Sequence, residues 1–429
     1  MKKTSEASPK ASPWAWIPSL YFAEALPYVA VMSISTVMYA RLGLSNSQIA
    51  FYTSLLYLPW AVKPLWSPFI DLSKTKRWWI LVMEVCMTVA IAGVALHISA
   101  ESFLPLTLIF FWIMAFSSAT HDIAADGFYM LALNPHEQTL YVGIRSTFYR
   151  IATIAGSGLL IMLAGTLETF TRRIAFSWTV TFFALAAFFV LLTLWHFFFL
   201  PRPKADSKRR TPSVSRLMGD FLRTFLSFLR KPQAFTAILF MLLYRLPEAL
   251  IVKMANLFMI APTSEGGLGL STQEIGFVQG TVGVLGLTLG GILGGLAAAR
   301  IGLKRCLWPM VASITVPDLV YVYLSFTQVQ SFPLINTLVF IEQFGYGFGF
   351  TGYMLYLIYF SQGEQRTSHY ALCTAFMALS MMLPGMVAGD LQEAVGYANF
   401  FLIVMACCAV TVAVSALLKI DPDFGKKEP

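Results

Sequence analysis

Long apolar segments follow one another along almost the whole chain, and this feature constrains the fold most strongly. A helix needs about 20 consecutive apolar residues to cross a bilayer core, and the segments reach that length with only short polar gaps. Of the 429 residues 57% are hydrophobic and only 12% are charged, which excludes an ordinary soluble domain. The pattern predicts an all-α membrane protein with twelve spans, at residues 14–41, 46–70, 78–98, 103–133, 139–165, 174–199, 234–261, 272–299, 304–327, 333–361, 366–390 and 395–419.

The N-terminal residues 1–13 are polar and lead directly into a full-length span. A cleaved signal peptide has a shorter apolar region that ends in a small-residue cleavage site, so we expect Trp14 to begin the first span. The five cysteines lie inside or at the edges of spans without regular loop spacing, which favours small core residues over a disulfide framework. They are Cys86, Cys306, Cys373, Cys407 and Cys408. We therefore expect no metal site, and the sequence indicates no cofactor.

The basic residues are distributed by membrane topology. With the twelve spans in place, 22 Lys and Arg residues fall on one side of the membrane, whereas only Arg41, Arg172 and Arg173 fall on the other. Cytoplasmic loops carry an excess of basic residues, so both termini are predicted to be cytoplasmic. The net charge of +8 is thus explained by contact with membrane lipid and indicates no nucleic-acid partner.

A long polar segment after the sixth span divides the chain into two six-span halves. The predicted units are a cytoplasmic tail 1–13, a bundle 14–199, a linker 200–233, a second bundle 234–419 and a tail 420–429. Within the linker, apolar residues recur at helical spacing from Ser213 to Arg230. This pattern predicts an amphipathic helix on the anionic membrane surface, with a calmodulin-like partner protein as the alternative.

The two halves repeat a loop sequence after their second spans. The stretches "SPFIDLSKTKR" (67–77) and "GLAAARIGLKR" (295–305) share a small first residue and a closing Lys-Arg pair. They resemble the loop motif of the major facilitator superfamily, whose acid is kept as Asp71 in the first copy and replaced by Ala299 in the second. An acid at a helix end that faces basic residues can latch neighbouring helices in one state. The candidate gating residues are Asp71, Lys76, Arg77, Lys304 and Arg305; the basic ones could equally be topology signals alone.

Repeated halves are typical of alternating-access transporters, which place the solute site between the halves near the bilayer midplane. Placing an ionisable residue inside a membrane span costs free energy, and such residues are therefore candidates for that site. Asp122 and Asp126 are four residues apart and share one helix face. Counted from the helix ends, Asp122 has the depth of Arg150, and Asp126 that of Arg145. We predict an Asp122–Arg150 pair that couples proton movement to opening; a purely structural ion pair is the alternative.

Related sequences begin the two halves. "YFAEALPY" (21–28) and "YRLPEALIVK" (244–253) place Glu24 and Glu248 at comparable positions, which adds Glu24 to the proton-coupling candidates. A break at Pro247 can expose backbone carbonyls to a cavity. The candidate solute-cavity residues are Arg245, Glu248, Arg145, His121, Tyr21, Glu342 and Tyr346. A structural or interface role is expected for Lys63, Glu84, His97, His196 and Lys253.

Several lines resemble the muropeptide permeases, an AmpG-like family of the major facilitator superfamily with acetyl-CoA-transporter and siderophore-importer relatives. The most specific are "LPWAVKPLWSPFID" (58–71), "SATHDIAADGF" (118–128), "YRIATIAGSG" (149–158) and "LYRLPEAL" (243–250). The resemblance implies proton-driven import of an amphipathic solute, an anhydro-muramyl peptide in the permeases, through a multi-pass monomer in a bacterial inner membrane. Asp122, Asp126 and Arg150 match the family pattern, whereas His121 replaces a glutamine, which leaves a siderophore or acetyl-CoA-type solute open.

Two other classes of protein compete with a transporter. A membrane-embedded acyltransferase could use His121 as its base, because buried histidines serve that chemistry. A receptor or sensor that has lost transport is the other possibility. Duplicated halves with matching loops have no evident use in such an enzyme, and the sequence therefore favours a transporter over an enzyme.

Overall fold

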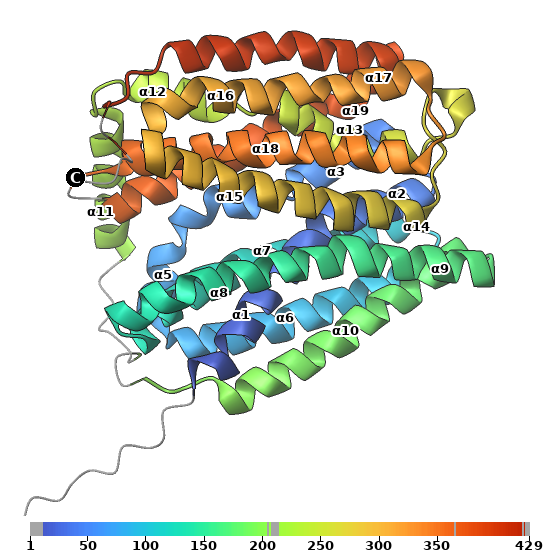
Figure 1. The fold of residues 1–429 in the computed structure, drawn as a ribbon. Coiled ribbons are helices and arrows are strands. Elements are labelled where there is room, and N and C mark those ends of the chain that lie inside the picture. Colours follow the sequence, from blue (N-terminus) through green and yellow to red (C-terminus); the bar gives the residue numbers. More distant parts are fainter. Residues whose placement is uncertain (1–11, 204–205, 207–213, 364–365, 423, 425–429) are drawn as a thin grey trace, which may run out of the picture.

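The computed structural model describes residues 12–203, 206, 214–363, 366–422 and 424, whose regular elements are all helices. Long helices run side by side, those of the first half in one group and those of the second half in another (Figure 1). We call the end that carries Leu200 and Lys231 the linker end, and the opposite end, with the turns at Gly43 and Arg172, the far end.

The helices have the following bounds. In the first half they are η1 (Pro13–Ala15), α1 (Ile17–Val29), η2 (Ala30–Ile34), α2 (Ser35–Arg41), α3 (Asn46–Leu55), α4 (Leu58–Val62), η3 (Lys63–Leu65), α5 (Ser67–Ser73), α6 (Lys76–His97), α7 (Phe103–Ala132), α8 (Pro135–Thr153), η4 (Ile154–Leu160), α9 (Ile161–Thr171) and α10 (Ile174–Phe199). After the linker helix α11 (Val214–Leu229) come α12 (Ala234–Leu243), α13 (Leu246–Ile260), η5 (Thr263–Glu265), α14 (Thr272–Phe277), η6 (Val278–Gly283), α15 (Val284–Ile301), α16 (Leu303–Thr315), η7 (Val316–Asp318), α17 (Leu319–Thr327), α18 (Phe332–Ser361) and α19 (Arg366–Ala416).

Nine helical stretches among the described residues are long and apolar enough to cross a membrane. The predicted span 46–70 is not one of them, because it is broken into α3, α4, η3 and α5. The predicted span 333–361 forms the long helix α18, which is likewise not one of the nine. The predicted spans 366–390 and 395–419 form one element, α19, whose backbone turns at Gly396 with a φ of 76°. The expected loop between these two spans is therefore helical, and the turn lies at a glycine because an L-residue is strained at that angle.

Breaks within the spans are a regular feature of this fold. A π-helical turn interrupts the chain at η2, η4 and η6, in the predicted spans 14–41, 139–165 and 272–299. The span 234–261 breaks at Arg245, whose φ of −99° and ψ of 17° are not helical. Pro247 follows at the start of α13, where proline is tolerated because its missing N–H leaves no hydrogen bond unmade. Irregular backbone at membrane depth is found where it lines a cavity or is buried in protein.

The outer surface is apolar in the way a lipid-facing surface must be. Large side chains such as Leu96, Phe198 and Phe235 are 67%, 73% and 80% exposed. Exposed apolar surface on this scale is not tolerated in water. The described chain is accordingly a multi-pass membrane protein.

The linker helix α11 forms over Val214–Leu229, in agreement with the predicted helix from Ser213 to Arg230. Phe228 is completely buried against the rings of Phe360, His369 and Phe376 of the second half. Leu222 and Leu226 are half exposed. The helix thus packs Phe228 and, partly, Phe225 against the second half and leaves Leu222 and Leu226 available to the membrane surface.

Candidate functional site

A cavity of about 460 Å³ lies between the two helix groups. The first half contributes three acids and Lys63 to its wall, and the second half contributes Arg245. The acids are Glu24, Asp122 and Asp126. The rest of the wall is mainly aromatic, small or flexible: Tyr28, Tyr57, Trp60, Ser118, Tyr149, Tyr370, Ala371, Thr374, Met377, Ala378 and Met381. The cavity therefore combines charges of both signs with apolar and aromatic surface.

Two of the three acids each contact a base. The Lys63 ammonium contacts Oδ2 of Asp122 directly. Arg145 Nη2 lies 2.8 Å from Oδ1 of Asp126, and the Tyr21 hydroxyl donates to the same oxygen at 3.3 Å. The Arg145 guanidinium also stacks 4.4 Å from the centre of the Tyr21 ring, which fixes its orientation. Asp122 and Asp126 share one face of α7, as their spacing predicts.

Glu24 lies beside the Lys63–Asp122 and Arg145–Asp126 ion pairs. It is within hydrogen-bonding reach of Asp122, whereas its Oε2 has no hydrogen-bond partner. The cluster thus holds three carboxylates and two cations, Lys63 and Arg145. With all five groups ionised the cluster has a net charge of −1, which a single proton would neutralise. Arg245, the other base in the cavity wall, forms no ion pair with these three acids among the described residues.

The predicted pair of Asp122 with Arg150 is wrong. Arg150 Nη1 instead donates to Thr288 Oγ1 across the interface at 3.1 Å. The depth count does not determine which way a side chain points around its helix. Lys63, for which the sequence indicates a structural or interface role, lies in the cavity wall, because the chain breaks at η3 within the predicted span 46–70. The proline at position 64, next to Lys63, is the sequence signal that could have revealed this break.

Several predicted cavity residues do not line the cavity. Arg145 and Tyr21 support Asp126, and Tyr346 contacts the Arg245 guanidinium with its hydroxyl. Arg245 reaches the cavity wall while its guanidinium lies 4.6 Å from the Phe350 ring centre. Glu248 and Glu342 are buried within the second half, at 2% and 1% exposure. Glu24 and Glu248 therefore do not occupy equivalent environments, although their sequences are related.

His121 also points away from the cavity. Its Nε2 lies 3.3 Å from Oε1 of Glu84, and Nδ1 of His196 lies 2.6 Å from the same oxygen. The second nitrogen of His196 is 2.9 Å from the Ser19 hydroxyl. All three ionisable side chains are fully buried. Sequence reasoning placed His121 in the cavity and did not connect it with Glu84 and His196, because three different helices bring these residues together.

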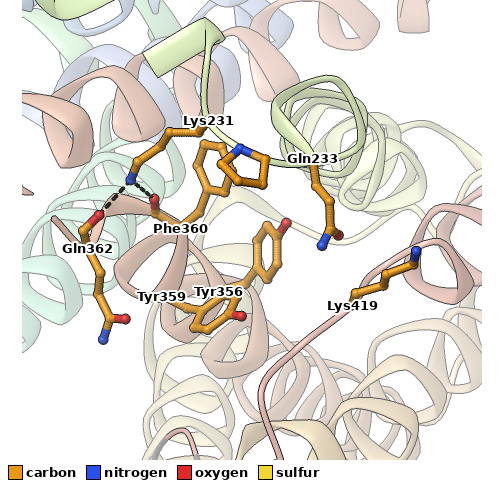
Figure 2. A pocket seen from close by; sticks show the side chains of 8 residues that line it. Lys231, Gln233, Tyr356, Tyr359, Phe360, Gln362 and Lys419 are labelled. Atoms are coloured by element: carbon orange, nitrogen blue, oxygen red, sulfur yellow. Dashed lines mark hydrogen bonds between the residues drawn. The ribbon is translucent and has the colours of Figure 1, made fainter. Parts of the chain in front are cut away.

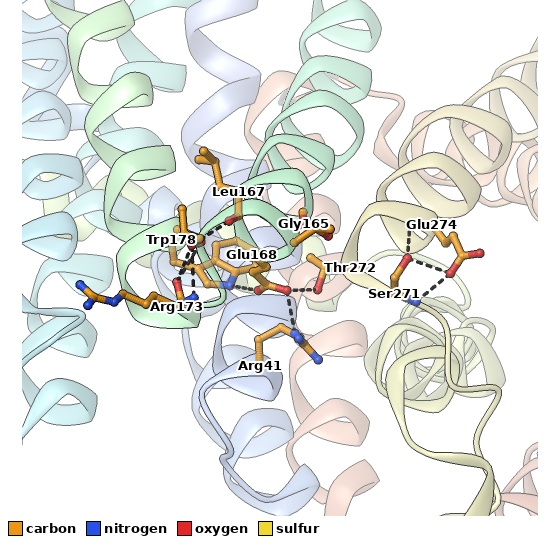
Figure 3. Close-up of polar contacts among 12 residues, drawn as sticks. Arg41, Gly165, Leu167, Glu168, Arg173, Trp178, Ser271, Thr272 and Glu274 are labelled. Carbon is orange, nitrogen blue, oxygen red and sulfur yellow. Dashed lines mark hydrogen bonds and ion pairs between the residues drawn. The ribbon is translucent and has the colours of Figure 1, made fainter.

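The two halves meet closely at the far end, where Glu168 is the centre of a polar network (Figure 3). Its carboxylate accepts from Trp178 Nε1 at 2.8 Å and pairs with Arg41 Nε at 3.1 Å, both in the first half. Thr272 of the second half donates to it at 2.9 Å. At Gly280 a Cβ would collide with the backbone of Gly158. Nothing in the sequence pattern singled out this network, because its members come from four separate helices.

A second group of contacts joins the halves at the same end. Asn46 Nδ2 donates to Gln392 at 2.6 Å and to the Tyr397 hydroxyl at 2.8 Å. The Ser47 amide donates to Glu393 at 2.7 Å. Closer to the cavity, Lys253 Nζ donates to Thr53 Oγ1 at 3.1 Å. These contacts close the far end of the interface.

At the linker end the first copy of the repeated loop motif is held by Asp206, a residue that sequence reasoning missed. The Lys76 and Arg77 amides donate to the Asp206 carboxylate at 2.7 and 3.0 Å. The Arg77 guanidinium donates to the carbonyls of Leu200 and Phe197 at the end of α10. Lys304 and Arg305 in the second copy are exposed, and the side chain of Asp71 lies outside the described residues.

A smaller pocket of about 240 Å³ also opens at the linker end (Figure 2). Its Lys231 ammonium is bound to the carbonyls of Phe360 and Gln362, and burial lowers the pKa of this amine. Lys231 therefore fastens the linker to the end of α18. None of the three cavity acids lines this pocket.

A charged cavity enclosed between two helix groups, closed at one end and built into an apolar multi-pass fold, defines a membrane transporter. The sequence model of the Major Facilitator Superfamily matches residues 19–385, and the chain belongs to that family. The anhydromuropeptide permease of Escherichia coli K12 is 25% identical over 395 residues, which cover 90% of this chain and 76% of the permease. A putative transporter AmpG 4 of Rickettsia conorii is 23% identical over 92% of this chain and 94% of its own length. The chain is thus similar to AmpG-named transporters over most of its length.

Solved structures have the same fold. The nucleoside transporter NupG superposes with a TM-score of 0.71 at 16% identity, over 94% of this chain and 98% of its own. A D-xylose-proton symporter gives a TM-score of 0.68 at 14% identity, over 96% and 98% of the two chains. The named relatives and these structures are transporters and not enzymes, which disfavours the acyltransferase hypothesis.

Proposed function

We propose that the protein imports an amphipathic solute, such as an anhydro-muramyl peptide, together with protons by alternating access. The observation that carries this proposal is the cavity cluster of Glu24, Asp122 and Asp126 with Lys63 and Arg145. Three acids and two bases leave one carboxylate without a compensating charge. An uncompensated charge at membrane depth is unfavourable in free energy. A proton is the smallest ion that can do this and leave again.

In the proposed cycle, one proton binds the acid cluster before the loaded carrier reorients. Glu24 is the acid best suited to hold it, because neither Lys63 nor Arg145 forms an ion pair with it and a protonated Glu24 can donate to Asp122. Movement of that proton to Asp122 would release Lys63. This order of steps keeps the coupling role predicted for Asp122, Asp126 and Glu24. The base released from its ion pair is now Lys63 instead of Arg150.

The cavity wall favours a solute with both charged and apolar parts. Lys63 and Arg245 suit a carboxylate, whereas the acids suit an amine. Aromatic side chains such as Trp60 and Tyr149 can pack on sugar rings, and Met377 and Met381 adapt to irregular shapes. An amino sugar that bears a peptide has all of these features. The volume of about 460 Å³ falls in the usual range of about 300–1,000 Å³ for small-molecule sites.

The predicted topology gives the direction of access. If the termini are cytoplasmic, as the basic residues predict, the far end faces the outside and its polar contacts are the closed outer gate. We propose twelve spans in two moving bundles, 14–199 and 234–419, joined by the linker. Asp71, Lys76, Arg77, Lys304 and Arg305 then form the inner gating loops, and Arg150 with Thr288 joins the bundles during closure. The proposed setting is a bacterial inner membrane, with the protein acting as a monomer.

Uptake by purified protein in proteoliposomes tests this proposal. A labelled anhydro-muramyl tripeptide should accumulate when the outside is acidified and the membrane potential is clamped. Asp122→Asn should abolish this accumulation but retain exchange of labelled for unlabelled solute. Accumulation of a ferric siderophore or acetyl-CoA in its place would overturn the solute class. Wild-type accumulation by Asp122→Asn would exclude Asp122 from coupling.

A further inference from the structure

Three carboxylates meet in the interior of the second half, outside the wall of the cavity. Glu248 lies in the first turn of α13, Asp318 ends the short helix η7, and Glu342 lies in the middle of α18. Each offers one oxygen, and these oxygens lie within 4.8 Å of one another. The side chains are only 1–3% exposed. Such a cluster cannot stay fully ionised in a buried site without a compensating charge.

No basic side chain of the described residues lies within ion-pair distance of these three acids. The Arg245 guanidinium attracts Glu248 only from beyond that distance. Neutral donors serve only two of them. Gln343 and Tyr321 donate to Glu342 at 3.0 and 3.3 Å, and Cys408 donates to Asp318 at 3.5 Å. Both oxygens of Glu248 are buried without any hydrogen-bond partner. Because one of them belongs to the group within 4.8 Å, this unpartnered carboxylate is aimed into the cluster.

We propose that Glu248, Asp318 and Glu342 bind one hard metal cation of the size of Na⁺ or Ca²⁺. Carboxylate oxygens are the ligands that such ions prefer. Oxygens on opposite sides of Ca²⁺ lie about 4.6–5.2 Å apart, since each is about 2.3–2.6 Å from the ion. The three oxygens all lie within 4.8 Å of one another, which is compatible with that geometry. Mg²⁺ dehydrates reluctantly and usually keeps several waters, which a buried site formed by three carboxylates does not favour.

The surrounding backbone suits such an ion. Glu248 follows the break at Arg245, and Asp318 ends a short helix that separates α16 from α17. Interrupted helices coordinate cations in transporters because their breaks expose backbone carbonyls. The bound ion ties α13, η7 and α18 together. It also fixes the first turn of α13 next to Arg245, which lines the solute cavity. This site does not depend on the proposed solute or on proton coupling.

Binding to the purified full-length protein tests the site without any transport assay. NaCl, CaCl₂ and MgCl₂ are titrated into protein in choline chloride at constant ionic strength and pH, and heat of binding and Tm are recorded. We expect saturable binding and a rise in Tm with Ca²⁺ or Na⁺. The ion that binds and raises Tm shows whether the site takes a divalent or a monovalent cation. A response to Mg²⁺ alone would overturn the assignment to Na⁺ or Ca²⁺. A Tm that depends on pH but on none of the three salts would show that the acids share protons instead.

Variants tie the response to these residues. Glu248→Gln keeps the side-chain shape but removes one carboxylate ligand. Changing a residue that only supports a metal ligand weakens metal binding by about 10- to 100-fold. Loss of the ligand itself should weaken binding by more than this. Without added ion the variant should have a higher Tm than the wild type, because an unpartnered buried charge has been removed. Asp318→Asn should weaken binding in the same way if Glu248→Gln fails to fold. The exposed loop residue in Glu101→Gln is the matched control and should leave binding unchanged. Unaltered binding in both site variants would disprove the assignment.

Discussion

Each half of the molecule contains a cluster of three carboxylates, but the two halves compensate them differently. In the first half, Lys63 and Arg145 contact Asp122 and Asp126 at the wall of a cavity. In the second half, no basic side chain of the described residues pairs with Glu248, Asp318 or Glu342, which lie away from that cavity. Built-in cations leave the first cluster one charge short of neutrality, which suits exchange of a proton. The second cluster lacks them and suits a metal ion.

This comparison shows why related sequences need not share a role. Glu24 and Glu248 follow the same local pattern, yet Glu24 lines the cavity beside two ion pairs and Glu248 does not. What decides their chemistry is the set of charges that other helices bring near them. Those charges are distant in sequence.

The largest effect is expected when the base of the first cluster is removed. In Lys63→Met, Asp122 loses its ion-pair partner at membrane depth. Breaking a fully buried pair costs about 3–5 kcal/mol, and this pair, whose side chains are 26% and 19% exposed, should cost an amount near the lower end of that range. We expect a Tm drop in detergent and loss of solute uptake. The double variant Lys63→Met with Asp122→Asn removes both members of the ion pair, so it adds no unpaired charge, and it should recover most of the stability but not the uptake. Lys74→Met removes an exposed lysine and should match the wild type in both assays. Equal Tm values for the single variant and the wild type would contradict the ion pair.

The next effect separates coupling from stability. Glu24→Gln mimics the protonated acid and leaves Lys63 and Arg145 with their partners, so the protein should remain folded. One pH unit is worth about 1.36 kcal/mol per proton, which supports about tenfold accumulation for one proton per solute. In Glu24→Gln the accumulation should fall to equal concentrations on both sides, with exchange retained. The measurement is the steady-state inside-to-outside ratio at increasing pH gradients. A ratio that still follows the gradient would show that another acid carries the proton.

A smaller effect is expected at the far end, where Glu168 forms an ion pair with Arg41, just as Asp122 and Asp126 of the first cluster pair with bases. Thr272→Val removes the hydrogen bond that the second half donates to Glu168, a loss of about 1 kcal/mol. That corresponds to about a fivefold higher population of the state open at this end. Thiol labelling of a cysteine introduced near Arg41 measures the change. Thr169→Val is the matched control, because Thr169 donates only within its own helix, to Gly165. Identical labelling rates in the two variants would argue against a gate here.

The sequence is sufficient for the helical membrane fold and for the candidate acids, but not for their partners. Apolar length identifies α7 and α10 almost to the residue, since burial in lipid alone demands it. Spacing correctly places Asp122 and Asp126 on one face. The partner of Asp122 was misjudged because helix depth carries no information on direction around the axis. Asp206 and the network at Glu168 depend on contacts between distant helices, which no local pattern encodes.

The smallest effect is expected for His121, the departure from the family pattern that suggested a changed solute. The structure gives this histidine a different environment, the Glu84 carboxylate that it shares with His196, and it does not line the cavity. Glutamine, the residue of the resembling permeases, can also donate to Glu84. His121→Gln should therefore lower the free energy of unfolding by no more than about 1 kcal/mol, the contribution of one hydrogen bond, with a correspondingly small change in Tm. It should leave the order of solute preference in competition assays unaltered.

His196→Leu provides the contrast within the same cluster. It removes the closer of the two contacts to Glu84, at 2.6 Å, and leaves the carboxylate with His121 alone. A buried acid that loses such a partner should destabilise the first half by about 3 kcal/mol, again without a change in solute preference. A shift in preference with His121→Gln would mean that this buried trio shapes the cavity through Asp122, its neighbour on α7. The first half would then contain one coupled network of acids and bases around Asp122 and not two separate clusters.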